Sequence, residues 1–234
     1  IERIFLTEKS WLSMARKVFF ESEWGAQKAQ VHYNLIKERL VGLGRGGSIP
    51  FPDADRYNGS LQLLLVANHF LQKGGDLAYQ AFIKIRQTSP DVTFHIVGGD
   101  PGIEIRNTPG VVYHGFLRKE QPAELQQLVQ LYADAFLLLH PTREDTNPLV
   151  ITEAGYFGCP AISVDRFAIP ELIRNGDTGF LLKVLSVEGL VSTIRRLIDD
   201  KEAYIVMRNH VLTYSRSHFS WDTIGHRLRD TIKL

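Results

Sequence analysis

The stretch LQLLLVANHFLQKGGDLAYQAFIKIR, residues 61–86, contains the pattern that decides the fold. Residues 61–67 form an apolar run with Gln62 as its single polar residue, as expected for a parallel β-strand that is buried on both faces of its sheet. Residues 69–75 predict a loop, and residues 76–86 predict a helix with Asp76 as its N-cap. A buried strand that leads through a short loop into a helix is the beginning of a parallel crossover unit.

The alternation of strands and helices continues along the chain. Further strands are expected at residues 93–97, 111–113, 135–139, 160–164 and 179–182, and helices at residues 122–132, 148–157 and 169–174. Thr146 or Asn147 is expected to cap the helix at 148–157, with Pro148 at its first position and Gly158 ending it. This alternation predicts right-handed crossovers and an α/β fold with a Rossmann-like, doubly wound parallel sheet.

Extra helices are expected at both ends of this pattern. Helices at residues 2–16 and 22–37 flank a short apolar run at 18–20, and residues 187–234 are expected to be helical with a break near 215–220. The proline-rich residues 48–52 predict an extended linker, because proline blocks both a helix and a central strand. We expect the first elements to belong to a region that lies upstream of the chain.

Composition excludes several classes of protein. The chain has 234 residues, 44% of them hydrophobic, which is enough for one large core. Its 27 basic and 26 acidic residues nearly balance, which gives no support to nucleic-acid binding driven by charge. The only cysteine, Cys159, predicts a buried inert thiol and a reducing, cytoplasmic compartment. No apolar run is long enough to span a bilayer.

Two motif matches are set aside. Residues 42–47, GLGRGG, fit the GxGxxG pattern, but a phosphate-binding loop of this kind must lead into a helix, and Pro50 and Pro52 prevent one. Asp53 and Asp55 fit the DxD pattern of a metal-binding motif. Because they follow the prolines of a linker, we expect a solvated turn there.

Ligands of doubly wound folds bind beyond the carboxyl ends of the strands, so the loops at residues 68–75, 98–101, 115–118, 141–147 and 165–168 are the candidates. In the first of them, Lys73 stands between a strand end and a helix start, beside two glycines that let backbone amides approach an anion. One lysine with oriented amides suits a diphosphate. The alternative is a glycine-rich turn with an exposed lysine, and His69 is equally compatible with a structural and a ligand-contacting role.

Glu153 lies inside an apolar helix, close to its start. A carboxylate at that place can accept two charge-assisted hydrogen bonds from a vicinal diol such as a ribose. Asp145, eight residues earlier, is placed to meet the hydroxyls of a second sugar. Two acids for two polyols and one lysine for two phosphates describe a nucleotide sugar. Alternatively, Glu153 pairs with a buried arginine or caps a neighbouring loop.

With these residues, the chain resembles the C-terminal domain of retaining glycosyltransferases of the GT-B fold, specifically family four, also called glycosyl transferases group 1. The resemblance covers residues 49–234. Asp145 and Glu153-Ala154 have the spacing of the family's acid pair, with Asp in place of the first Glu and Glu144 one position away. Lys73-Gly74 resembles the family's phosphate-binding Lys-Gly, whereas Asn68 replaces its Arg. Residues 170–179 are similar to its Pro-Glu run, with Phe167-Ala168 where a glycine pair is usual.

The resemblance implies a domain plan and a mechanism. Residues 1–48 would be a remnant of the N-terminal domain with the inter-domain crossing, residues 49–218 the nucleotide-sugar-binding Rossmann-like domain, and residues 219–234 a helix returning to the N-terminal domain. The donor would be a UDP- or GDP-linked sugar, transferred with retention, without a cofactor or metal. The leaving diphosphate itself would deprotonate the acceptor, and the protein would position the reactants and stabilise charge.

The resemblance also implies roles for particular residues. Asp145 and Lys73 would be catalytic, and the donor-binding residues would be Glu153, Glu144, Asn68, His69, Gly74, Gly98, Gly99, Gly115, Phe116, Thr146, Asn147 and Leu149. The acceptor would be a glycan, a lipid or a small molecule, with possible peripheral membrane contact through the missing domain. We expect the chain alone to fold but not to transfer sugar. Two alternatives are a nucleotide-sugar epimerase of the same fold and a binding-only nucleotide-sugar module.

Overall fold

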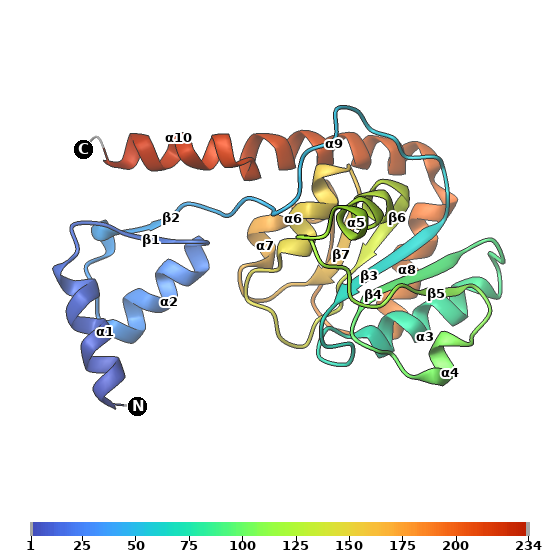
Figure 1. Ribbon diagram of the computed structural model, residues 1–234, viewed down its shortest axis with the longest axis horizontal. Coiled ribbons are helices and arrows are strands. Elements are labelled where there is room, and N and C mark those ends of the chain that lie inside the picture. Colours follow the sequence, from blue (N-terminus) through green and yellow to red (C-terminus); the bar gives the residue numbers. More distant parts are fainter. Residues whose placement is uncertain (1, 233–234) are drawn as a thin grey trace. The chain divides into compact units, whose positions relative to one another are not determined.

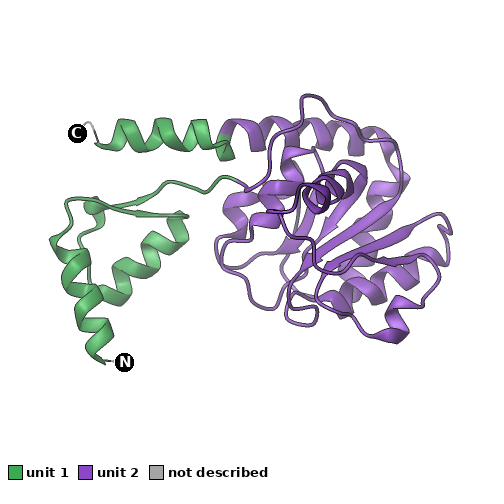
Figure 2. Cartoon of the chain, viewed as in Figure 1, with its two compact units in different colours: residues 1–46, 218–234 green, residues 47–217 purple. Residues whose placement is uncertain are grey.

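The computed structural model describes residues 2–232, which belong to two compact units (Figure 2). The larger unit runs from Gly47 to Ser217 and contains a six-stranded sheet. The smaller unit combines the residues up to Gly46 with those from His218 onward. Among the described residues, no helix has the length and apolar character needed to cross a bilayer.

The sheet of the larger unit is entirely parallel, with the order β5-β4-β3-β6-β7-β8 (Figure 1). Its strands are β3 (Gln62–Ala67), β4 (Thr93–Gly98), β5 (Val111–Tyr113), β6 (Ala135–Leu139), β7 (Ala161–Val164) and β8 (Gly179–Leu182). The chain builds outward from β3 in one direction and then returns to add β6 on the other side. The expected doubly wound, Rossmann-like sheet is therefore confirmed, and its order reverses between β3 and β6.

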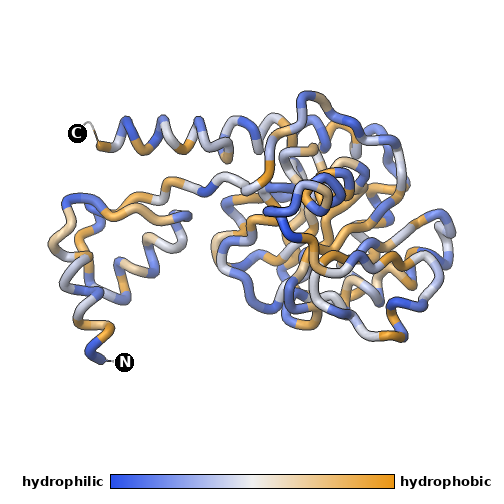
Figure 3. Tube along the Cα trace, in the orientation of Figure 1, coloured by the Kyte–Doolittle hydropathy of each residue, from blue (hydrophilic) through white to orange (hydrophobic). Residues whose placement is uncertain are grey.

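Helices cover both faces of this sheet. They are α3 (Gly75–Arg86), α4 (Ile103–Arg106), α5 (Pro122–Asp134), α6 (Leu149–Tyr156), α7 (Ile169–Leu172), α8 (Val187–Asp199) and α9 (Lys201–Phe219). Residues of α3, α8 and α9 pack into one core with Leu63 and Leu65, whereas α5 packs against β3 and α6. Leu64, between them in β3, is buried as well, so the strand is apolar after Gln62, its first residue (Figure 3).

Several element boundaries differ from those expected, for local reasons. Asp76 is not the N-cap of α3; the cap position is Gly74, whose left-handed φ of 74° begins the helix one residue earlier. Pro148, and not Thr146 or Asn147, occupies the N-cap position of α6. The helix expected at 22–37 ends at Tyr33, because Asn34 adopts a left-handed conformation (φ 53°) and its amide bonds back to the Gln30 carbonyl.

The smaller unit contains short elements from both ends of the chain. They are α1 (Glu2–Met14), β1 (Val18–Phe20), α2 (Glu23–Tyr33), the 3₁₀ turn η1 (Lys37–Arg39), β2 (Leu40–Gly42) and α10 (Trp221–Ile232). The unexpected strand β2 pairs in parallel with β1, and no helix follows it at residues 43–47, which agrees with setting aside the GxGxxG match. On α10, Arg227 donates to the Leu43 carbonyl at 3.2 Å.

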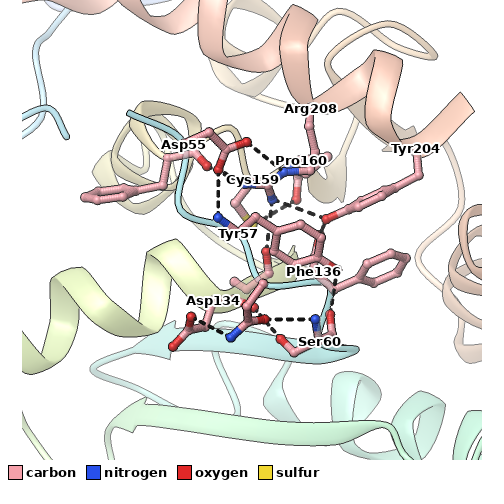
Figure 4. A network of polar contacts seen from close by, with 12 residues as sticks. Asp55, Tyr57, Ser60, Asp134, Phe136, Cys159, Pro160, Tyr204 and Arg208 are labelled. Carbon is pink, nitrogen blue, oxygen red and sulfur yellow. Dashed lines mark hydrogen bonds and ion pairs between the residues drawn. The ribbon is translucent and has the colours of Figure 1, made fainter. Parts of the chain in front are cut away.

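The turn at residues 53–55 is exposed, as expected, and a buried arginine also anchors it (Figure 4). The Arg208 side chain, 2% exposed, donates to Asp55 Oδ1 at 2.8 Å and to the Phe157 carbonyl at 2.7 Å, and its guanidinium stacks on the Tyr57 ring. The contact itself was not expected, because Arg208 lies 153 residues from Asp55 along the chain. Cys159 lies in the same region, is buried as expected, and burial raises the pKa of its thiol to about 12.

Replacing Arg208 with Met is expected to destabilise the larger unit by about 3 kcal/mol, because Asp55 and two buried carbonyl groups lose their donor. Chemical denaturation measures this loss. Arg216→Met on the same helix is the matched control, since Arg216 is exposed, donates to the Pro52 carbonyl and lies over the Phe51 ring, and it should change stability by less than about 0.5 kcal/mol. Equal effects of the two variants would contradict the anchoring role.

Candidate functional site

Two loops meet where the strand order reverses. One follows β3 and contains Lys73, and the other follows β6 and contains Asp145. Lys73 Nζ donates to Asp145 Oδ2 at 2.7 Å and to the Glu144 carbonyl at 2.9 Å. Both side chains of the ion pair are about four-fifths buried, at 20% and 19% exposure. A charged pair therefore occupies the edge of the sheet where ligands of this architecture bind.

Glycine permits the close approach of these loops. A Cβ on Gly74 would lie 1.9 Å from the Pro141 carbonyl oxygen, and the positive φ of Gly74 also disfavours any other residue. A bidentate ion pair also joins the second loop to the start of α3, because Arg143 donates to both carboxylate oxygens of Asp76 at 2.8 Å. The Arg143 guanidinium lowers the pKa of Asp76 below its ordinary value. The position of Lys73 is thus fixed by its neighbours.

His140, which the sequence analysis did not name as a site residue, is close to Asp145 of the ion pair with Lys73. It follows the last residue of β6 and is 1% exposed. Its Nε2 is 3.2 Å from Asp145 Oδ2, but neither ring nitrogen has a hydrogen bond of good geometry among the described residues. Burial lowers the pKa of His140 from 6.5 to about 4, so the imidazole is neutral at pH 7 and the contact with Asp145 is not an ion pair there.

A cavity of about 270 Å³ lies beside the carboxyl ends of β3 and β4, and Glu153 forms part of its wall. The Glu153 side chain is 0% exposed. Lys119 Nζ donates to it at 2.5 Å, the amide and hydroxyl of Ser48 at 3.0 and 2.8 Å, and the Tyr132 hydroxyl at 3.2 Å. In this ligand-free arrangement Glu153 caps a neighbouring loop and pairs with a lysine, whereas the expected alternative named a buried arginine.

The predicted site residues divide into three groups. Those that line the cavity are Asn68, Gly98, Phe116 and Glu153. Those of the loop contact described above are Lys73, Gly74, Glu144 and Asp145. The others lie in or next to the same loops but are not among the described residues that line the cavity: His69, Gly99, Gly115, Thr146, Asn147 and Leu149.

Sequence reasoning missed residues whose partners are distant along the chain. Arg118 and Lys119 line the cavity, where Asn68 replaces the arginine that the family resemblance led us to expect. Both cations are paired, Arg118 with Glu124 and Lys119 with Glu153. A basic pair two residues after Phe116, in a strand-end loop, was a visible signal. Ser48, 105 residues from Glu153, had no such signal, because it lies in a stretch that was predicted to be a linker.

The loop at residues 165–168 explains why glycine is usual there. Phe167 adopts φ 57°, a left-handed conformation that costs a non-glycine residue about 1–2 kcal/mol. The resemblance places a glycine pair at Phe167-Ala168, so the backbone shape is kept although the residue type differs. Within residues 2–232, no group of three or more His, Cys, Asp or Glu side chains is arranged to hold a metal ion.

Comparison with known proteins agrees with this geometry. The family model for glycosyl transferases group 1 matches residues 61–200, which is more than half of the chain. The chain therefore belongs to the group 1 glycosyltransferases. The matched residues include β3 with its lysine loop, β6 with its acidic loop, and α6 with Glu153.

Individual relatives are more distant. The chain is 25% identical over 169 residues to D-inositol 3-phosphate glycosyltransferase of Corynebacterium aurimucosum, covering 68% of this chain and 39% of that protein. It is 26% identical over 170 residues to a GDP-mannose-dependent alpha-(1-6)-phosphatidylinositol monomannoside mannosyltransferase of Mycolicibacterium smegmatis, covering 69% of this chain and 44% of that protein. The chain thus spans less than half the length of these two relatives.

Solved structures show the same fold. Anabaena Alr3699/HepE in complex with UDP superposes with a TM-score of 0.78 at 18% identity, covering 99% of this chain and 68% of that one. The pneumococcal O-GlcNAc transferase GtfA, in complex with UDP and GlcNAc, gives 0.78 at 14% identity, covering 99% and 47%. The chain has the architecture found in GT-B glycosyltransferases.

The buried neutral state of His140 predicts a stability change with pH. Between pH 6.5 and about 4 the unfolded chain binds a proton on this residue and the folded chain does not, so stability is fully present above this window and lost as the pH falls through it. Between pH 7 and 5, His140→Gln should lose about 2 kcal/mol less stability than the wild type in urea titrations. Parallel losses in the two proteins would contradict a neutral buried His140.

Proposed function

We propose that the chain is the donor-binding part of a glycosyltransferase that moves a sugar from a UDP- or GDP-linked donor to an acceptor with retention of configuration. The observation that carries this proposal is the Lys73–Asp145 pair at the reversal of strand order, beside a cavity with Glu153 in its wall. Membership in the group 1 family supports it. Two structural neighbours were solved with UDP bound, which supports a nucleoside-diphosphate ligand for this architecture.

The donor would lie along the edge of the sheet. Its ribose diol would reach Glu153, and its base would contact the apolar cavity wall of Val97, Leu128 and the exposed Phe116 ring. The diphosphate would lie at Lys73, with the backbone amide of Leu149, the first residue of α6, as a further donor, whereas the Gly74 amide donates to the Leu71 carbonyl. The cavity of about 270 Å³ suits the nucleoside, and the rest of the donor would extend toward Asp145.

The reaction would need no protein nucleophile. The bond between the anomeric carbon and the diphosphate breaks, the acceptor oxygen bonds to the same face of the sugar, and a diphosphate oxygen takes the acceptor proton. Lys73 stabilises the negative charge that grows on the leaving diphosphate, which is the largest electrostatic task in such a transfer. Asp145 holds hydroxyls of the transferred sugar and so orients it. Lys73 would therefore donate hydrogen bonds to Asp145 and to the diphosphate at the same time.

The remaining parts of the proposal rest on the family resemblance. The acceptor would be a glycan, a lipid or a small molecule, bound with help from residues outside this chain, and the chain alone would bind the donor without transferring sugar. We place the protein in the cytoplasm, with possible peripheral membrane contact and without a cofactor. An epimerase of the same fold is less favoured, because the matched family is a glycosyltransferase family.

Lys73→Ala is expected to weaken binding of UDP or GDP by about 1.5–3 kcal/mol, the usual contribution of a hydrogen bond to a charged group. Binding of the nucleoside alone should barely change, because it has no phosphate. Isothermal titration with both ligands measures this. Lys84→Ala, on the exposed face of α3 where it pairs with Glu188, is the control and should match the wild type. Equal losses for nucleotide and nucleoside would show that Lys73 acts through the structure.

Glu153→Gln keeps the size of the side chain but removes the charge that strengthens bonds from a ribose diol. Affinity for the ribonucleotide should fall by about 1–3 kcal/mol. The 2′-deoxy analogue should bind the wild type less tightly and should lose less on mutation, so the two changes should be coupled in a double-mutant cycle. Thermal unfolding run alongside measures the separate loss of the Lys119 pair. Additive losses would remove Glu153 from the ribose site.

A further inference from the structure

The hydrogen-bonding capacity of Glu153 is already used in the ligand-free protein. Its Oε1 accepts from three donors, namely Lys119 Nζ at 2.5 Å and the hydroxyl and amide of Ser48 at 2.8 and 3.0 Å. Its Oε2 accepts only from the Tyr132 hydroxyl, at 3.2 Å. A carboxylate offers about four lone-pair sites on its two oxygens. A diol that needs two of them must therefore displace a donor from Oε1.

Of these donors, the Ser48 hydroxyl has the chemistry of a sugar hydroxyl. It donates to Glu153 Oε1 at 2.8 Å and accepts from Lys119 Nζ at 2.8 Å. A ribose hydroxyl between a carboxylate and an ammonium would make the same two bonds. Lys119 differs, because its side chain is 31% exposed and its flexible stem can move with a ligand.

The backbone holds Ser48 at this place. The Gly47 amide donates to the Tyr156 hydroxyl at 2.6 Å. A Cβ on Gly47 would lie 2.9 Å from both Glu153 Cγ and the Tyr156 ring, so glycine lets this segment run directly over the carboxylate. The Ser48 side chain is thus directed at Glu153 by the path of the main chain, and it can leave by rotation about its own χ1 without moving that path.

We propose that Ser48 Oγ occupies, in the nucleotide-free protein, the position that a ribose hydroxyl takes at Glu153, and that the nucleotide must displace it to bind. Ser48 is then an internal competitor that lowers nucleotide affinity. Lys119 belongs to the nucleotide site, and its hydrogen bond to the serine hydroxyl is replaced by one to the ribose hydroxyl. This inference rests on the proposed function, because it needs a ribose at Glu153.

Ser48→Ala tests the competition, because it removes the hydroxyl and leaves the backbone amide in place. Titrated with UDP and with GDP, the variant should bind the preferred nucleotide about fivefold more tightly than the wild type, a gain of about 1 kcal/mol. The 2′,3′-dideoxy form of that nucleotide should show no gain. The double variant Ser48→Ala/Glu153→Gln should also show no gain over Glu153→Gln. A serine that merely supports the structure would give a loss in the first measurement.

Ser60→Ala is the matched control. Ser60 is a serine of the same unit, and its hydroxyl donates to the Asp134 carbonyl at 2.7 Å instead of to a cavity residue. It should leave nucleotide affinity unchanged. Unchanged or weaker binding by Ser48→Ala, when the wild type binds, overturns the competition and leaves the proposed function standing. Failure of the wild type to bind either nucleotide overturns the proposed function, and the competition with it.

Discussion

The close approach of the loops after β3 and β6 is the contact on which the site depends. It exists because Gly74 has no side chain to meet the Pro141 carbonyl, and it is closed by the ion pair between Lys73 and Asp145. The apolar strands beneath place these loops at the reversal of strand order, where no crossover helix fills the gap between them. A lysine from one loop and an acid from the other thus face the same small volume.

Burial imposes the second constraint. Lys73 and Glu153 both find partners inside the protein when no ligand is present, Lys73 in Asp145 and Glu153 in Lys119 and Ser48. An unpaired charge at a position such as Glu153 would cost several kcal/mol, so these internal partners stabilise the fold around the site. Ligand binding becomes an exchange of partners, and its net free energy is the difference between two sets of hydrogen bonds.

The fold could be predicted from the sequence because its signals are local. The apolar runs and the glycine and proline breaks identified all six strands of the sheet within one residue at either end. Helix starts were less certain: Asp76 was a plausible cap by residue type, but Arg143, from another loop, takes its carboxylate. The ion pair of Asp55 was not expected for the same reason, since its partner Arg208 is brought close only by the fold.

The site was predictable to the extent that its residues follow strand ends or a family spacing, as Lys73 and Glu153 do. The partners of Glu153 were not, because Lys119 and Ser48 are 34 and 105 residues away from it. His140 directly follows the apolar residues of β6 in the sequence. Its burial, which determines its charge, is a property of the folded chain.

A crystal structure of this chain with UDP or GDP bound tests the central claim most directly. The account predicts a diphosphate oxygen within hydrogen-bond distance of Lys73 Nζ and the ribose diol at Glu153, with the Ser48 hydroxyl turned away. A nucleotide bound elsewhere, with the contacts of Lys73 to Asp145 and of Ser48 to Glu153 both intact, would contradict it.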